Sequence, residues 1–126
     1  MIKKILTFFL IILFFTSCSQ KQAIENKSAT IIFKTAKLKF YDKGFISRYS
    51  DHINLIIFNF GNIAFDLKIY KDKVCKGLFE CVSHKEFNEK FLHKSYLDNF
   101  LYELFSKQNI YFKDKKNKVF IKVIYD

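Results

Sequence analysis

An apolar segment followed by an alternating one constrains the fold of this chain more than any other feature. Residues 53–60 (INLIIFNF) are apolar on both faces, as in a central strand that is covered on each side. Gly61 and Asn62 then predict a two-residue hairpin turn. In residues 63–69, apolar and polar side chains alternate with the period of a half-buried strand. The two segments predict an antiparallel hairpin inside a sheet.

Shorter patterns extend this hairpin into an α+β domain. Strands are expected at residues 37–40 and 45–49 around a turn at 42–44, and again at 110–112 and 119–125 around the charged loop 114–118. Ser83 with Glu86 is typical of a capped helix start, and Ser95 with Asp98 predicts a second one. The order predicts an antiparallel β-meander plus a C-terminal hairpin, which form a curved sheet covered by two short helices.

The N-terminus has the three parts of a secretory leader. Lys3 and Lys4 precede an apolar run at residues 5–15, and small residues follow it. The run is shorter than the ~20 residues that span a bilayer. An export signal that is removed is therefore expected, and an uncleaved anchor is the alternative.

Residues 15–18 (FTSC) resemble the bacterial lipobox, in which a large apolar residue and two small ones precede a modified cysteine. The resemblance implies cleavage before Cys18 and its acylation by fatty chains such as palmitate. It divides the chain into a signal peptide (1–17), an acylated tether (18–29) and one domain (30–126). Ser19, where enteric lipoproteins of the inner membrane carry Asp, favours the outer membrane. An ordinary leader with an incidental cysteine is the alternative.

Cys75 and Cys81 enclose five residues that include Gly77, in a loop expected between the last meander strand and the first helix. In an exported protein such a pair predicts a structural disulfide. Redox chemistry usually uses a Cys-x-x-Cys spacing, which is not present here. A metal site could recruit His84 and His93, but the spacing matches no common zinc site. We therefore expect no metal and no cofactor.

The composition bears on partners and on catalysis. The net charge is +10, which could attract anionic lipid or nucleic acid. Arg48 is the only arginine, however, and phosphate and base recognition favours arginine, so no nucleic-acid partner is expected. The chain has no nucleophile elbow and no phosphate-binding glycine loop. We therefore expect a protein that is not an enzyme.

The order of elements over residues 37–105, together with the lipobox, resembles the LolA/LolB-type half-barrel lipoproteins. The resemblance implies a curved sheet around a lipid-binding cavity that helices close. In this sequence the cavity could be lined by Phe58, Phe60, Phe65, Leu67 and Leu101. The same residues could equally form an ordinary core.

Two functions follow. The first is a non-catalytic envelope lipoprotein with a structural or interaction role, bound to the membrane by its lipid anchor and to an envelope protein partner. The alternative is LolB-like binding or transfer of lipid or lipoprotein acyl chains at the outer membrane. A filled core with an exposed apolar or charged patch favours the first, and an empty apolar cavity favours the second.

Overall fold

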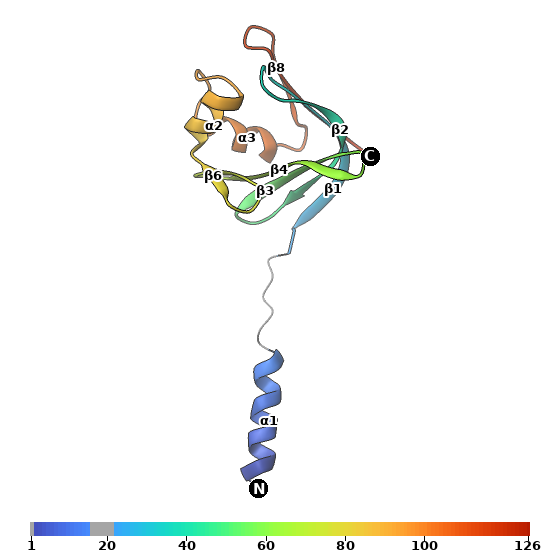
Figure 1. Cartoon of the computed structure of the whole chain (residues 1–126), viewed down its shortest axis with the longest axis vertical. Coiled ribbons are helices and arrows are strands. Elements are labelled where there is room, and N and C mark those ends of the chain that lie inside the picture. The colour runs from blue at the N-terminus through green and yellow to red at the C-terminus, as the bar shows by residue number, and fades with distance from the viewer. Residues whose placement is uncertain (1, 16–21) are drawn as a thin grey trace.

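The structure, a computed structural model, describes residues 2–15 and 22–126. Helix α1 (Ile2–Phe15) contains the apolar run of the expected leader. Residues 22–126 form one eight-stranded sheet and two further helices (Figure 1). The strands are β1 (Glu25–Lys34), β2 (Lys39–Arg48), β3 (His52–Asn59), β4 (Asn62–Tyr70), β5 (Val74–Lys76), β6 (Glu80–Val82), β7 (Tyr111–Asp114) and β8 (Val119–Tyr125), and the helices are α2 (His84–Phe91) and α3 (Phe100–Ser106). None of the helices in the described residues is both long and apolar enough to cross a membrane.

The sheet is antiparallel throughout and has the order β6-β5-β4-β3-β2-β1-β8-β7. Strands β1 to β6 follow one another as a meander. The β7–β8 hairpin returns to the other side of β1, so the first strand lies inside the sheet. The α+β fold predicted from the sequence is confirmed.

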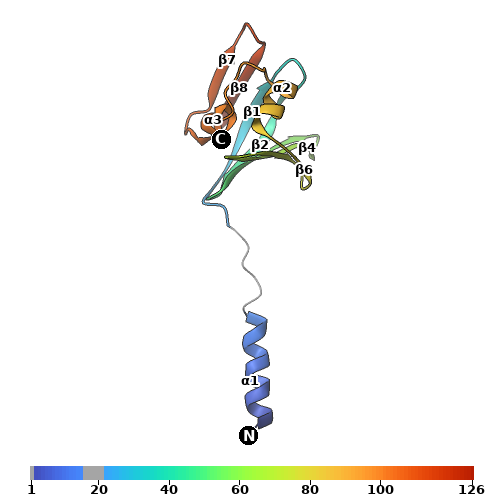
Figure 2. The ribbon, with the colours of Figure 1, turned by 90° about the vertical axis from the view of Figure 1, so that its left-hand side faces the viewer.

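The sheet curves around α2 and α3, which lie on its concave side (Figures 1 and 2). This inner face carries the alternate apolar residues of each long strand, such as Phe33 of β1, Leu55 of β3 and Leu67 of β4. Phe87 of α2 and Phe105 of α3 pack against them and are fully buried. Burial of these aromatic and aliphatic side chains supplies the main stabilisation of the domain.

Strand β1 begins earlier than the sequence indicated. Glu25 already pairs with Arg48 of β2, so residues 25–29 of the expected tether belong to the sheet. Only Ala29 of these five is buried. The sequence pattern did not predict this part of the strand, because its side chains are mostly polar. Backbone pairing with β2, and not an apolar face, holds these residues in the sheet.

The turn expected at residues 42–44 is wrong, because β2 runs unbroken through them. Gly44 pairs with Ala29 of β1 and with Ile57 of β3. A Cβ atom at this glycine would lie 2.1 Å from the carbonyl oxygen of Ile56 and 2.7 Å from Cδ1 of Ile31. The glycine therefore serves a close approach of strands and not a change of direction.

The central hairpin is present with its turn shifted by one residue. Asn59 pairs with Asn62, so Phe60 and Gly61 form the turn, with φ angles of 51° and 80°. Two successive positive φ values are typical of a type I′ turn. Phe60 therefore occupies a position that usually takes Asn, Asp or Gly.

One of the two predicted helix starts is confirmed. The side chain of Ser83 accepts a hydrogen bond from the backbone of Glu86, and α2 follows. The start predicted at Ser95 is wrong, because α3 begins at Phe100 and the Ser95 hydroxyl bonds the ring of His93 instead. The apolar stripe expected for this helix was Leu97, Leu101, Leu104 and Phe105. The last three are buried in α3, whereas Leu97 precedes the helix and is exposed.

Candidate functional site

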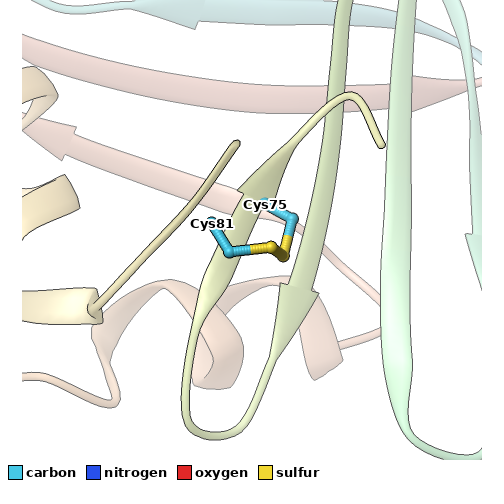
Figure 3. The surroundings of a disulfide bond; sticks show 2 residues. All are labelled: Cys75 and Cys81. Carbon is cyan, nitrogen blue, oxygen red and sulfur yellow. A yellow bond between two sulfur atoms is a disulfide. The ribbon is translucent and has the colours of Figure 1, made fainter. Parts of the chain in front are cut away.

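The expected lipidation site, Cys18, lies outside the described residues. The expected disulfide is confirmed: Cys75 and Cys81 are bonded (Figure 3). They are direct cross-strand partners in β5 and β6, where the sequence indicated a loop. Closing so short a hairpin stabilises the fold by roughly 2 kcal/mol through the unfolded chain.

The two histidines that were considered for a metal site have other partners. His84 is buried, and its Nε2 lies 2.6 Å from the carbonyl oxygen of Tyr70. The Nδ1 of His93 lies 2.6 Å from the hydroxyl oxygen of Ser95. Across residues 2–15 and 22–126, no cluster of three or more histidine, cysteine or acidic side chains forms a metal site.

The five residues expected around a lipid cavity separate into two groups. Phe65, Leu67 and Leu101 lie in the core, packed with the other buried side chains. Phe58 and Phe60 do not join them. Phe58 is half-buried on the opposite face, where its ring packs edge-on against Phe45, and Phe60 is 98% exposed at the turn. The interpretation of Phe58 and Phe60 as cavity residues is therefore wrong, since alternation and the turn direct them away from the helices.

A groove of about 510 Å³ lies elsewhere, between α3 and the edge strand β7. Aromatic and aliphatic side chains make up most of its lining, and Glu103 and Lys107 of the α3 region add one charge of each sign. The lining residues are Ser95, Tyr96, Leu97, Asn99, Phe100, Glu103, Leu104, Lys107, Tyr111 and Phe112.

Three rings hold this groove in shape. Tyr96 packs against Phe100 with ring centroids 4.6 Å apart, and Phe112 meets both rings nearly edge-on, at 5.6 Å and 4.7 Å. Such tilted contacts suit the quadrupoles of the rings. The loop before α3 is thereby fixed to the edge of the sheet.

A hydrogen bond anchors the end of β7 to this aromatic cluster. The hydroxyl of Tyr96 donates to Asp114 Oδ2 at 2.7 Å, and Asn117 donates to the same carboxylate. These hydrogen bonds lower the pKa of Asp114 below its ordinary value. Burial, and then the contact with Asp114, raises the pKa of Tyr96. At neutral pH the pair is therefore a neutral phenol that donates to a carboxylate.

Beside the groove, β7 presents an open sheet edge. Its other side is paired with β8, and the amide of Val123 donates to the carbonyl of Ile110. In an antiparallel ladder, hydrogen-bonded pairs alternate along the strand. Phe112 is therefore the next residue bonded to β8, and the backbone N–H and C=O groups of Tyr111 and Lys113 point outward.

The groove and edge together can accept an extended peptide. A strand added to β7 would bond to Tyr111 and Lys113, and its alternate side chains would enter the groove. The sequence indicated β7 as a strand but not as an edge, because the order of strands in a sheet depends on distant pairings. The exposure of Leu97 and Tyr111, which would mark the groove, is visible only in the folded structure.

Comparison with known proteins gives no match: no family model, no curated protein and no solved structure is significantly similar to this chain.

Proposed function

We propose that this protein is an exported lipoprotein, anchored to the outer membrane through acylated Cys18, that binds an extended segment of an envelope partner at β7. The role is that of a non-catalytic interaction protein. The groove of about 510 Å³ beside an open strand edge carries the proposal. Backbone hydrogen bonds would supply affinity, and the groove would select side chains.

The charges around β7 define the peptide further. The β7–β8 hairpin carries five lysines, and its one acidic residue, Asp114, is already bonded to Tyr96 and Asn117. Lys107 adds a further cation at the groove, and Glu103 is the acidic residue that lines the groove. The favoured ligand is therefore an extended peptide that alternates apolar and acidic residues.

The alternative of LolB-like lipid carriage has less support. Three of the residues expected to line its cavity, Phe65, Leu67 and Leu101, fill the core instead. An exposed groove at the sheet edge fits the interaction role better than the transport of acyl chains, which requires an enclosed apolar space.

The peptide proposal is tested with a displayed library of random short peptides, selected against the full chain in phosphatidylcholine vesicles. Selected peptides are expected to alternate apolar and acidic residues. Their binding is expected to slow amide hydrogen exchange at Tyr111 and Lys113. Protection of another region, or no selection above background, would overturn the proposal.

A pair of variants at Lys113 separates two contributions to peptide binding, the backbone hydrogen bonds of the strand edge and the charge of the side chain. Lys113→Pro removes an outward N–H but no bond to β8, and we expect it to weaken peptide binding about tenfold. Lys113→Gln keeps the N–H and removes only the charge, so it is expected to have the smaller effect. Equal losses in both variants would mean that charge alone attracts the peptide.

The anchor is tested separately in cells. Radioactive palmitate is expected to label the protein, and Cys18→Ala is expected to abolish the label. Cys75→Ala serves as the control, because Cys75 is held in a disulfide within the domain. An unlabelled parent protein would refute the lipoprotein proposal and leave the peptide site to be judged by its own test.

A further inference from the structure

The outer face of the sheet, opposite α2 and α3, is open to solvent and has an unusual composition. The pairing register places on this face the residues that alternate with the core positions. We define the outer face as these positions of β2, β1, β8 and β7, together with the β3–β4 turn that borders them. Lys39 of β2, Lys34 of β1, Phe120 of β8 and Lys113 of β7 form one row across it.

Exposed apolar side chains concentrate on this face. Residues 22–126 contain ten large exposed apolar side chains, and six of them lie here. A monomeric domain normally scatters such residues, and a cluster marks an interaction surface. The six are Tyr41, Phe45, Phe60, Ile63, Tyr111 and Ile124.

The charges on the face as defined have one sign, and the outward Asp66 of β4 lies outside it. The outward positions of β2, β1, β8 and β7 hold five lysines and no carboxylate: Lys34, Lys39, Lys43, Lys113 and Lys122. Asp126 follows β8 and forms an ion pair with Lys43 at 2.7 Å. The face is therefore complementary to an anionic surface.

A hollow at one end of the face concentrates this charge. It has a volume of about 490 Å³ and lies between the β1–β2 and β7–β8 turns. Lys34, Lys39 and Lys118 line it together with Thr35 and Ala36, and no acidic side chain does. Three lysines that line one hollow without an acidic neighbour suit a phosphate group.

Three aromatic rings of the face already lie under lysine ammonium groups. The ammonium groups of Lys34, Lys122 and Lys113 lie over the rings of Tyr41, Tyr111 and Phe120, at 5.7–5.9 Å from the centroids. A single-stranded nucleic acid would need those ring faces for its bases. Tyrosine and lysine side chains with apolar stems and polar tips instead suit the headgroup region of a bilayer.

We propose that the outer face lies against an anionic phospholipid bilayer, with a headgroup phosphate in the hollow between Lys34, Lys39 and Lys118. Phe60 and Ile63 at the β3–β4 turn enter the interface beside it. This contact goes beyond the anchor at Cys18 and beyond peptide capture at β7. It fixes how the domain is oriented on the membrane.

The chain contains no tryptophan, so one introduced tryptophan reports its own surroundings. The full chain is reconstituted into phosphatidylcholine vesicles with or without phosphatidylglycerol, and lipids with brominated acyl chains serve as quenchers. Tyr41→Trp reports the outer face and Tyr102→Trp, on α3, the opposite side. We expect quenching several times stronger for Tyr41→Trp, only in anionic vesicles, and lost at high salt.

Two matched triple variants test the charges in the Tyr41→Trp background. Changing Lys34, Lys39 and Lys122 to Gln is expected to weaken the attraction on the order of one hundredfold and to abolish the quenching. Changing Lys71, Lys85 and Lys90 to Gln removes the same charge from exposed positions elsewhere and is expected to leave quenching in place.

Three results would overturn the proposal. Equal quenching of the two tryptophans would show that the domain has no fixed orientation. Equal effects of the two triple variants would show that only net charge matters. Single-stranded oligothymidine could restore the fluorescence of the Tyr41→Trp protein where inorganic phosphate does not. That result would show that the face prefers nucleic acid. None of these readouts depends on Cys18 or on the groove.

Discussion

Phe60 shows how one residue departs from what its turn favours. Among the described residues, only Phe60 and Lys118 are non-glycine residues with positive φ. For a bulky side chain this conformation is unfavourable by roughly 1–2 kcal/mol. Phe60 makes up for little of this by burial, because its side chain is almost fully exposed.

We therefore predict that Phe60→Asn stabilises the protein by about 1 kcal/mol, because Asn tolerates the left-handed region. Urea unfolding measures the change. Phe79→Asn is the control, since Phe79 is a similarly exposed ring without a positive φ. A gain of the same size in the control would attribute the effect to loss of exposed apolar surface and not to the backbone.

At the same scale, Gly44 shows why a correct residue pattern can give a wrong structure. Asp42 and Gly44 are typical turn formers, and the sequence offers no local sign against a turn. The neighbours that exclude any Cβ at Gly44 come from β3 and β1, and they meet only in the folded sheet. A local pattern can indicate that a position requires glycine, but it cannot distinguish a turn from a close approach of two strands.

At the scale of elements, α3 is held to the sheet by the only arginine. Nη2 of Arg48 donates to the carbonyl oxygens of Phe105 at 3.1 Å and Lys107 at 2.7 Å, at the end of the helix. Nη1 lies 3.6 Å from Glu25 Oε2. The planar guanidinium thus bridges the helix end and the first two strands.

We predict that Arg48→Lys destabilises the fold by about 1–2 kcal/mol, because one ammonium group cannot reproduce this fork. The free energy of unfolding in urea measures the loss. Glu25→Gln removes the ion pair but keeps both carbonyl bonds, so it is expected to lose under about 1 kcal/mol. If Arg48→Lys loses no more than Glu25→Gln, the bonds of the guanidinium to the end of α3 add nothing to its ion pair with Glu25.

Elements were predictable where their signals are local. Ser83 and Glu86 identify the start of α2 because the cap lies within four residues. Cys75 and Cys81 identify their disulfide because the hairpin is short. Ser95 offers the same local pattern, yet His93 takes its hydroxyl and the chain reaches helical geometry only at Phe100. A cap is therefore decided by the direction in which the hydroxyl is held as well as by spacing.

At the scale of the whole molecule, the position of β1 decides both candidate surfaces. The meander and the final hairpin were predictable, but the pairing of β1 with β8 joins residues about ninety positions apart. This pairing leaves β7 at the edge and aligns the lysines of four strands on one face. Neither the groove nor the basic face could be predicted from local patterns, because both depend on the pairing of β1 with β8.

The pairing of β1 with β8, and of β8 with β7, is expected to weaken in acid. The pKa values of Glu25, Asp114 and Asp126 are lowered, chiefly by hydrogen bonds with Lys27, Tyr96 and Lys43 respectively. A carboxyl with a lowered folded-state pKa stabilises the fold fully above its unfolded value near 4. That stabilisation is lost as the pH falls through the folded-state value.

All three carboxylates lie at the ends of β1, β7 and β8, so acid should loosen that half of the sheet first. We predict that lowering the pH from about 6 to about 3 speeds amide exchange, corrected for the intrinsic rate, more in β7 and β8 than in β5. Asp114→Asn keeps an acceptor for Tyr96 without the titrating charge, so its β7 amides are expected to respond less to acid. An equal response in β5, which the disulfide closes, would mean that acid acts on the whole core and not through these three carboxylates.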